Sequence, residues 1–148
     1  MRKIKFFINA LLAIIGITSC DKINTTPAEY GCPHATLDIS GKVISSDGKP
    51  IKGIQTIIQE EESEYYPRIK DTLYTDANGQ YNYTNKDIFS IPEKLTITFK
   101  DIDNEENGGK FANKTENVNK GEYKQTEKAS GWYKGKFELN KDVVLNKE

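Results

Sequence analysis

The chain has 148 residues, 36% of them hydrophobic, and its 21 basic and 22 acidic side chains leave a net charge of −1. This balance excludes the basic stripe with which nucleic-acid-binding proteins contact phosphates, so no nucleic acid is expected as a partner. Eight tyrosines and six phenylalanines supply apolar surface for a core, which excludes a globally disordered chain. The length suits one domain.

The first 20 residues, "MRKIKFFINALLAIIGITSC", have the order of a bacterial export signal. Arg2, Lys3 and Lys5 precede an apolar run over 6–17, which is shorter than the roughly 20 residues that a membrane-spanning helix needs. Small residues follow the run directly, as they do at a signal cleavage site. Residues 1–19 are therefore predicted to be a signal peptide with a signal helix, and not a buried N-terminal helix.

The signal ends in "ITSC", which resembles a bacterial lipobox, and Cys20 is accordingly predicted to carry lipid. Several acyl chains, palmitate among them, anchor a protein firmly where one chain holds it only marginally. The expected location is the cell envelope, at the outer membrane rather than the inner one, with membrane lipid bound through Cys20 and a tether over 20–35. A disulfide with Cys32 would require the lipobox match to be a coincidence, so Cys32 is expected to be unpaired.

From residue 36 onward the pattern favours strands. Residues 36–43 alternate so that Leu37, Ile39 and Val43 share one face, the pattern of a half-buried strand. Asn78-Gly79 is a turn dipeptide between apolar segments, and it predicts a hairpin of the strands on either side. Further strands are expected over 54–59, 95–100, 110–118 and 136–148.

Short strands with frequent turns, and no long 3.6-residue apolar period, predict an all-β fold. We expect an antiparallel Greek-key β-sandwich of about seven strands over 36–148. The stretches "ISGKVISSDGKPIKGIQTII" and "YTDANGQYNYT" resemble the carboxypeptidase regulatory-like domain, a transthyretin-like sandwich. The matching positions are mostly turn residues, which report fold and not chemistry. They are Gly41, Val43, Asp47, Gly48, Pro50, Gly53, Thr75, Asp76, Gly79 and Tyr81.

A second resemblance covers most of the chain. The lipobox, "YGCPHA", "DIDNEENGG" and "GWYKGKF" are similar to segments of the radical SAM-associated lipoprotein family of Gram-negative anaerobes. The resemblance implies a lipid-anchored exported sandwich and a radical SAM enzyme as a partner, without an activity. Asn104 stands where a glycine is expected, and Asn tolerates the same left-handed backbone region.

Cys32 and Tyr30 are candidate sites for a modification that this radical SAM enzyme would install. The alternative for Cys32 is a small buried side chain, which is common for free cysteine. Cys32 and His34 share a face of an extended strand. They are too few ligands for zinc, and no partner that would orient a Cys–His nucleophilic pair is identified.

The loop "DIDNEENGG" gathers the carboxylates of Asp101, Asp103 and Glu105, a donor set that suits Ca²⁺. EF-hand spacing fails, because the twelfth position from Asp101 is Ala112. A solvated loop is the alternative reading, and no other cofactor is expected.

Two pairs of aromatic residues, Tyr65 with Tyr66 and Trp132 with Tyr133, would suit a binding surface for a glycan or an envelope protein. The alternative is packing against the sheets. Thr72 lies in "DTL", which resembles an O-glycosylation motif of some Gram-negative anaerobes.

The function expected from these features is a non-catalytic binding or structural module, and not an enzyme. One alternative is a substrate or carrier of a modification near Tyr30 to His34. Another is a small hydrolase, which a single histidine and the lack of a catalytic constellation disfavour.

Overall fold

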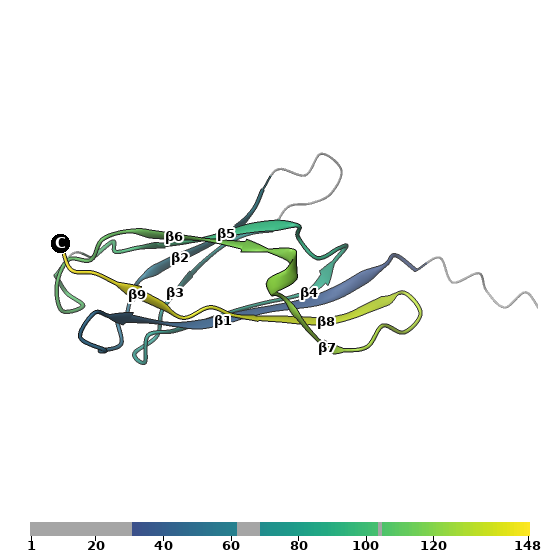
Figure 1. Ribbon diagram of the computed structural model, residues 1–148, viewed down its shortest axis with the longest axis horizontal. Coiled ribbons are helices and arrows are strands. Elements are labelled where there is room, and N and C mark those ends of the chain that lie inside the picture. The colour runs from purple at the N-terminus through teal and green to yellow at the C-terminus, as the bar shows by residue number, and fades with distance from the viewer. Residues whose placement is uncertain (1–30, 62–68, 104) are drawn as a thin grey trace, which may run out of the picture. The chain divides into compact units, whose positions relative to one another are not determined.

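The computed structural model describes residues 31–61, 69–103 and 105–148. Over these residues the fold is a β-sandwich, as predicted (Figure 1). Its elements are β1 (His34–Ser45), β2 (Gln55–Glu60), β3 (Lys70–Tyr74), β4 (Gln80–Ile88), β5 (Lys94–Lys100), β6 (Lys114–Asn119), the 3₁₀ turn η1 (Lys120–Glu122), β7 (Lys124–Glu127), β8 (Tyr133–Asn140) and β9 (Val143–Leu145). The predicted signal peptide, most of the tether, and the candidate residues Cys20, Tyr30, Tyr65 and Tyr66 lie outside the described residues.

The first sheet has the order β4-β1-β8-β7, with β9 paired to β1, and the second has the order β3-β2-β5-β6. All pairs of the second sheet are antiparallel. In the first sheet β1 pairs in parallel with both β8 and β9, so this sheet is mixed. The described residues hold nine strands, more than the seven expected, because β7 and β9 are short pieces beside longer strands.

The core lies between the sheets, and strict alternation fills it. Leu37, Ile39 and Val43 of β1 are completely buried, as the pattern predicted. The inward faces of β4 and β5 are buried as well, with the Tyr81 ring against Phe99 at 5.5 Å between centroids. β1, β4 and β5 therefore each contribute one apolar face, and burial of these faces is the main stabilising contribution.

Gly41 marks the break between β8 and β9. A Cβ atom here would lie 2.1 Å from the carbonyl oxygen of Lys141. That oxygen accepts a hydrogen bond of 2.6 Å from the Tyr81 hydroxyl, and the Lys141 N–H donates to the Ser40 carbonyl at 2.8 Å. A glycine lets the chain that leaves β8 cross close over β1 and continue as β9.

The hairpin predicted around Asn78-Gly79 is wrong. The turn itself is formed, since the Gly79 N–H donates to the Asp76 carbonyl at 3.0 Å. However, β3 pairs with β2 in one sheet and β4 pairs with β1 in the other, so the turn passes between the sheets. The turn residues correctly indicated that the chain reverses here. They did not indicate which strands pair with β3 and β4.

The sandwich has two ends. We call the end where β1 and β8 begin and β4 stops the entry end, because the described chain enters the fold there, and the opposite one the far end. The far end holds the turns after β1 and β3 and the loop after β5 (Figure 1). In the part of the chain that the structure describes, no helix has the length and apolar character needed to cross a membrane.

Candidate functional site

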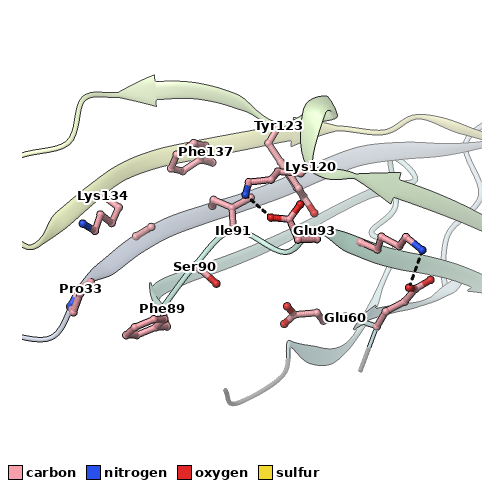
Figure 2. Close-up of a pocket in the computed structure, with 13 residues that line it drawn as sticks. Pro33, Glu60, Phe89, Ser90, Ile91, Glu93, Lys120, Tyr123, Lys134 and Phe137 are labelled. Carbon is pink, nitrogen blue, oxygen red and sulfur yellow. Dashed lines mark hydrogen bonds and ion pairs between the residues drawn. The ribbon is translucent and has the colours of Figure 1, made fainter. Parts of the chain in front are cut away.

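A cleft of about 770 Å³ opens between the two sheets at the entry end (Figure 2). We call it the entry cleft. Residues from both sheets, from the β4–β5 connection and from η1 line it, so five separate stretches of the chain contribute to one cavity. The lining residues are Pro33, Ala35, Glu60, Glu61, Phe89, Ser90, Ile91, Glu93, Lys94, Lys120, Tyr123, Lys134 and Phe137.

The walls of the entry cleft are apolar. Ala35 is buried on the inward face of β1, and its small side chain leaves space between the sheets. Phe137 on β8 and Ile91 in the β4–β5 connection are partly buried against the core. Phe89, just after β4, is 41% exposed at the rim. Clefts with aromatic and aliphatic walls and few polar groups are the usual sites for small molecules.

Charged residues ring the opening, and most of them neutralise one another. The Lys94 ammonium lies 3.4 Å from a carboxylate oxygen of Glu61, and Lys120 pairs with Glu93 (Figure 2). Both pairs are exposed and contribute little to stability. Lys134 on β8 is exposed, and no carboxylate of the described residues forms an ion pair with its ammonium. It is the cation at the rim that is available to a ligand.

Tyr123 lines the cleft where the chain leaves η1. Its hydroxyl is buried, and no hydrogen-bond partner for it occurs among the described residues. Burial raises the pKa of this phenol, and the carboxylates of Glu60 and Glu122 raise it further. Tyr123 is therefore a neutral ring at physiological pH, and it adds an uncharged wall to the cleft.

Cys32 and His34 lie at the entry end beside this cleft. The Cys32 thiol is free and exposed, so the alternative of a buried side chain is wrong. The His34 Nδ1 lies 3.3 Å from the carbonyl oxygen of Cys32, and the imidazole packs against the Tyr133 ring at 5.5 Å between centroids. These contacts hold the imidazole against protein and do not build a Cys–His nucleophilic pair.

In the loop after β5, the carboxylate of Asp101 accepts hydrogen bonds from other residues of the same loop. Asp101 accepts hydrogen bonds from the Phe111 N–H at 2.8 Å and from the Asn107 amide at 3.2 Å. Burial raises the pKa of Asp103, and the neighbouring Asp101 raises it further. Glu105 is exposed. Over the described ranges no group of three or more His, Cys, Asp or Glu residues is placed to hold a metal, so calcium here stays a prediction.

The remaining predicted sites are accessible. Trp132 is 47% exposed in the β7–β8 turn, and the hydroxyl of the partly buried Tyr133 donates to Glu127 at 3.1 Å. Thr72 is exposed on β3, which leaves O-glycosylation a prediction.

Sequence reasoning missed the entry cleft. Its residues span 33–137 in the chain, and no two of its walls belong to one motif. The one local signal was the pair of apolar residues Phe89 and Ile91 in the short connection between β4 and β5.

The β-sandwich of the described residues is similar in fold to parts of several dioxygenases. A scan of protein-family models finds no match, and a search of curated proteins finds no similar sequence. Among solved structures the chain is similar to 3-chlorocatechol 1,2-dioxygenase from Rhodococcus opacus 1CP, with a TM-score of 0.53 and 13% identity over 80% of this chain and 66% of that one.

Two further enzymes share the fold. Catechol 1,2-dioxygenase from Pseudomonas arvilla C-1 aligns with a TM-score of 0.56 and 13% identity over 80% of this chain and 54% of that one. Hydroxyquinol 1,2-dioxygenase from Pseudomonas putida DLL-E4 aligns with a TM-score of 0.54 and 10% identity over 94% of this chain and 71% of that one. The chain thus spans between about half and 71% of these enzymes, and at this identity the likeness concerns the fold alone.

These comparisons correct the functional expectation. The chain was predicted to be a non-catalytic binding or structural module and not an enzyme, on the ground that its sequence has a single histidine and no catalytic constellation. The solved structures with the same fold are dioxygenases, which contradicts that prediction. The physical reason is that a sandwich fixes a framework, whereas chemistry depends on the residues placed at its ends.

A non-haem iron centre would need several strong ligands from this chain. One common iron-binding set in non-haem oxygenases is two histidines and a carboxylate. His34 is the only histidine of the sequence, and its imidazole packs on Tyr133. Together with the lack of a metal-binding cluster among the described residues, this means that the donor set does not fit such an iron centre.

Proposed function

We propose that the entry cleft binds a small aromatic molecule that carries an anionic group. The observation that carries this proposal is the combination of apolar walls with the Lys134 ammonium at the rim, which has no ion-pair partner among the described residues. The volume of about 770 Å³ lies within the range of small-molecule sites, roughly 300 to 1,000 Å³. The likeness in fold to catechol 1,2-dioxygenase supports a ring compound as the ligand.

Each part of the ligand would meet a matching part of the cleft. The ring would lie against Phe89 and Phe137, because aromatic rings gain from offset or edge contacts with one another. The anionic group would lie at the rim near Lys134, where its charge remains partly hydrated. Lys94 and Lys120 are already paired with Glu61 and Glu93 and would contribute less.

Isothermal titration calorimetry with benzoate, phenol, catechol and cyclohexanecarboxylate tests this proposal. Benzoate should bind most tightly, because it alone has both a flat ring and a negative charge. Phe89→Ala should weaken benzoate about tenfold through the lost ring contact. Lys134→Gln should weaken it roughly fivefold and reduce the preference for benzoate over phenol.

Val144→Ala and Lys128→Gln are the matched controls. Val144 is 44% exposed on β9, at the far end, and Lys128 is an exposed lysine that does not line the cleft. Neither change should affect benzoate. Equal binding of all four compounds, or benzoate binding that survives both cleft substitutions, would overturn the proposal.

We also propose that the chain is exported and anchored in the envelope through lipid on Cys20, at the outer membrane. The lipobox "ITSC" behind a basic and apolar leader supports this. The resemblance to the radical SAM-associated lipoprotein family belongs to the same proposal, with a radical SAM enzyme as partner. Metabolic labelling with palmitate tests the anchor, and Cys20→Ser should abolish the label. Label that persists in this variant would contradict the proposal.

A further inference from the structure

The charged groups that line the entry cleft are equal in number, but they are not all paired. The lining residues carry three carboxylates and three ammonium groups. The two ion pairs described above neutralise two groups of each sign. The carboxylate of Glu60 and the ammonium of Lys134 remain, and neither forms an ion pair with another described residue. The cleft therefore holds one unpaired charge of each sign.

Glu60 and Lys134 belong to different sheets. Glu60 ends β2 in the second sheet, and Lys134 lies near the start of β8 in the first. Facing sheets are about 10 Å apart, whereas an ammonium and a carboxylate pair within about 4 Å. Figure 2 shows the two side chains at opposite sides of the lining residues, with Ile91 between them in that view. One molecule in the cleft can therefore meet a cation at one end and a carboxylate at the other.

The surroundings of Glu60 do not supply a cation. Glu60 is half-buried, whereas the paired Glu61 and Glu93 are exposed. Its Oε2 accepts a hydrogen bond from the Ile69 N–H at 3.2 Å. Burial raises the pKa of Tyr123 and the charge of Glu60 raises it further, so the two groups are neighbours, yet the phenol donates to no described residue. A carboxylate that loses water without gaining a cation favours a ligand that brings one.

From this placement of charges we propose that the entry cleft selects an aromatic acid with a positively charged amine opposite its carboxylate, and that Glu60 binds the amine. The inference rests on the ligand class proposed above and adds a second group to it. The ring lies against the apolar walls, the ligand carboxylate lies near Lys134, and the amine meets Glu60. Glu60 is then a specificity-determining residue, because it attracts a cationic substituent and repels an anionic one.

Isothermal titration calorimetry with benzoate, 4-ethylbenzoate, 4-(aminomethyl)benzoate and terephthalate tests this inference. The ethyl and aminomethyl groups have nearly the same shape, so these two compounds differ mainly in charge. 4-(Aminomethyl)benzoate should bind about fivefold more tightly than 4-ethylbenzoate, because its ammonium forms a hydrogen-bonded ion pair with Glu60. Terephthalate brings a second carboxylate to Glu60 and should bind most weakly of the four.

Glu60→Gln should remove the preference for the amine and strengthen terephthalate, while benzoate changes by less than about twofold. The glutamine carbonyl oxygen still accepts from the Ile69 N–H, so the end of β2 is retained. Lys134→Gln should weaken all four compounds, since each has the carboxylate that lies near Lys134. Glu105→Gln is the matched control, because Glu105 is exposed in the loop after β5 and does not line the cleft. It should change none of the four affinities.

The outcomes separate this inference from the proposed function. If benzoate binds but the amine gives no advantage over the ethyl group, the inference is overturned and the proposed function stands. The same holds if the advantage survives in Glu60→Gln, or if terephthalate binds as tightly as 4-(aminomethyl)benzoate. If none of the four compounds binds, both are overturned.

Discussion

The two ends of the sandwich are built on different principles. At the far end, turns between the sheets are fixed by short-range hydrogen bonds. Asp76 accepts from the N–H groups of Asn78 and Gln80 at 2.8 Å, and the Thr75 hydroxyl bridges the backbone of Ile51 and Ile54. At the entry end the sheets separate around a cleft whose residues come from five stretches of the chain. Local hydrogen bonds fix the turns of the far end, whereas the entry end contains an open cleft.

Gly79→Ala should produce the largest effect on stability. Its φ of +71° is unfavourable for alanine, and a Cβ would lie 2.4 Å from the Val43 carbonyl oxygen. We expect a loss of about 2 to 4 kcal/mol in the free energy of unfolding, measured by urea denaturation. Gly48→Ala is the matched control, because φ is +82° there but the Cβ meets open space. Equal losses at the two positions would contradict the role given to the close approach.

Thr75→Val should produce the second-largest loss of stability. It keeps the shape of a side chain that is 4% exposed but removes its bonds with the Ile51 carbonyl at 2.7 Å and the Ile54 N–H at 3.0 Å. Two buried backbone groups lose their partner, and we expect a loss of about 1 to 3 kcal/mol in chemical denaturation. Thr72→Val on exposed β3 should change stability by under about 0.5 kcal/mol. If both variants unfold alike, the Thr75 bridge is not the stabilising feature.

The smallest expected effect concerns pH. Burial tends to raise the pKa of Asp38, but hydrogen bonds from Lys136 and Thr84 outweigh it and lower the pKa. This carboxylate therefore stabilises the fold above its unfolded pKa of about 3.9, and the contribution is lost as the pH falls through its lower folded pKa. Burial and Asp101 raise the pKa of Asp103, so its ionisation destabilises the fold as the pH rises through the folded pKa.

Thermal unfolding between pH 3 and pH 7 checks both signs. Asp38→Asn should lower the melting temperature at pH 7 and have little effect at pH 3, with a loss under about 1 kcal/mol because the site is partly hydrated. Asp103→Asn should raise it at pH 7 by a few tenths of a kcal/mol at most. The same sign for both variants at pH 7 would contradict this difference.

The β-sandwich fold and the positions of several turns could be predicted from the sequence. Alternation identified the inward faces of β1 and β5, and turn residues such as Asp76 and Gly79 lie where the chain reverses. Strand partners were not predictable, because alternation gives the buried face of a strand but not its neighbour. β8 therefore lies parallel to β1 from about a hundred residues away, and the expected hairpin joins two sheets.

Most of the candidate site could not be predicted from the sequence. Cys32 and Trp132 were recognised as unusual from their residue types, and the structure finds both exposed at the entry end. The entry cleft has no counterpart in any motif. Lys134 and Phe89 became candidates only when their exposure, their neighbours and the space between the sheets were known.

The sequence by itself determined that the chain forms a β-sandwich and where its turns occur, because residue periodicity and turn chemistry act over a few neighbouring positions. It also carries the lipobox, which is a local pattern. Only the tertiary structure decided which strands share a sheet, where the sheets separate, and which side chains line the opening. Those features arise from contacts between residues distant in the chain, and their geometry is set when the two apolar faces close on each other.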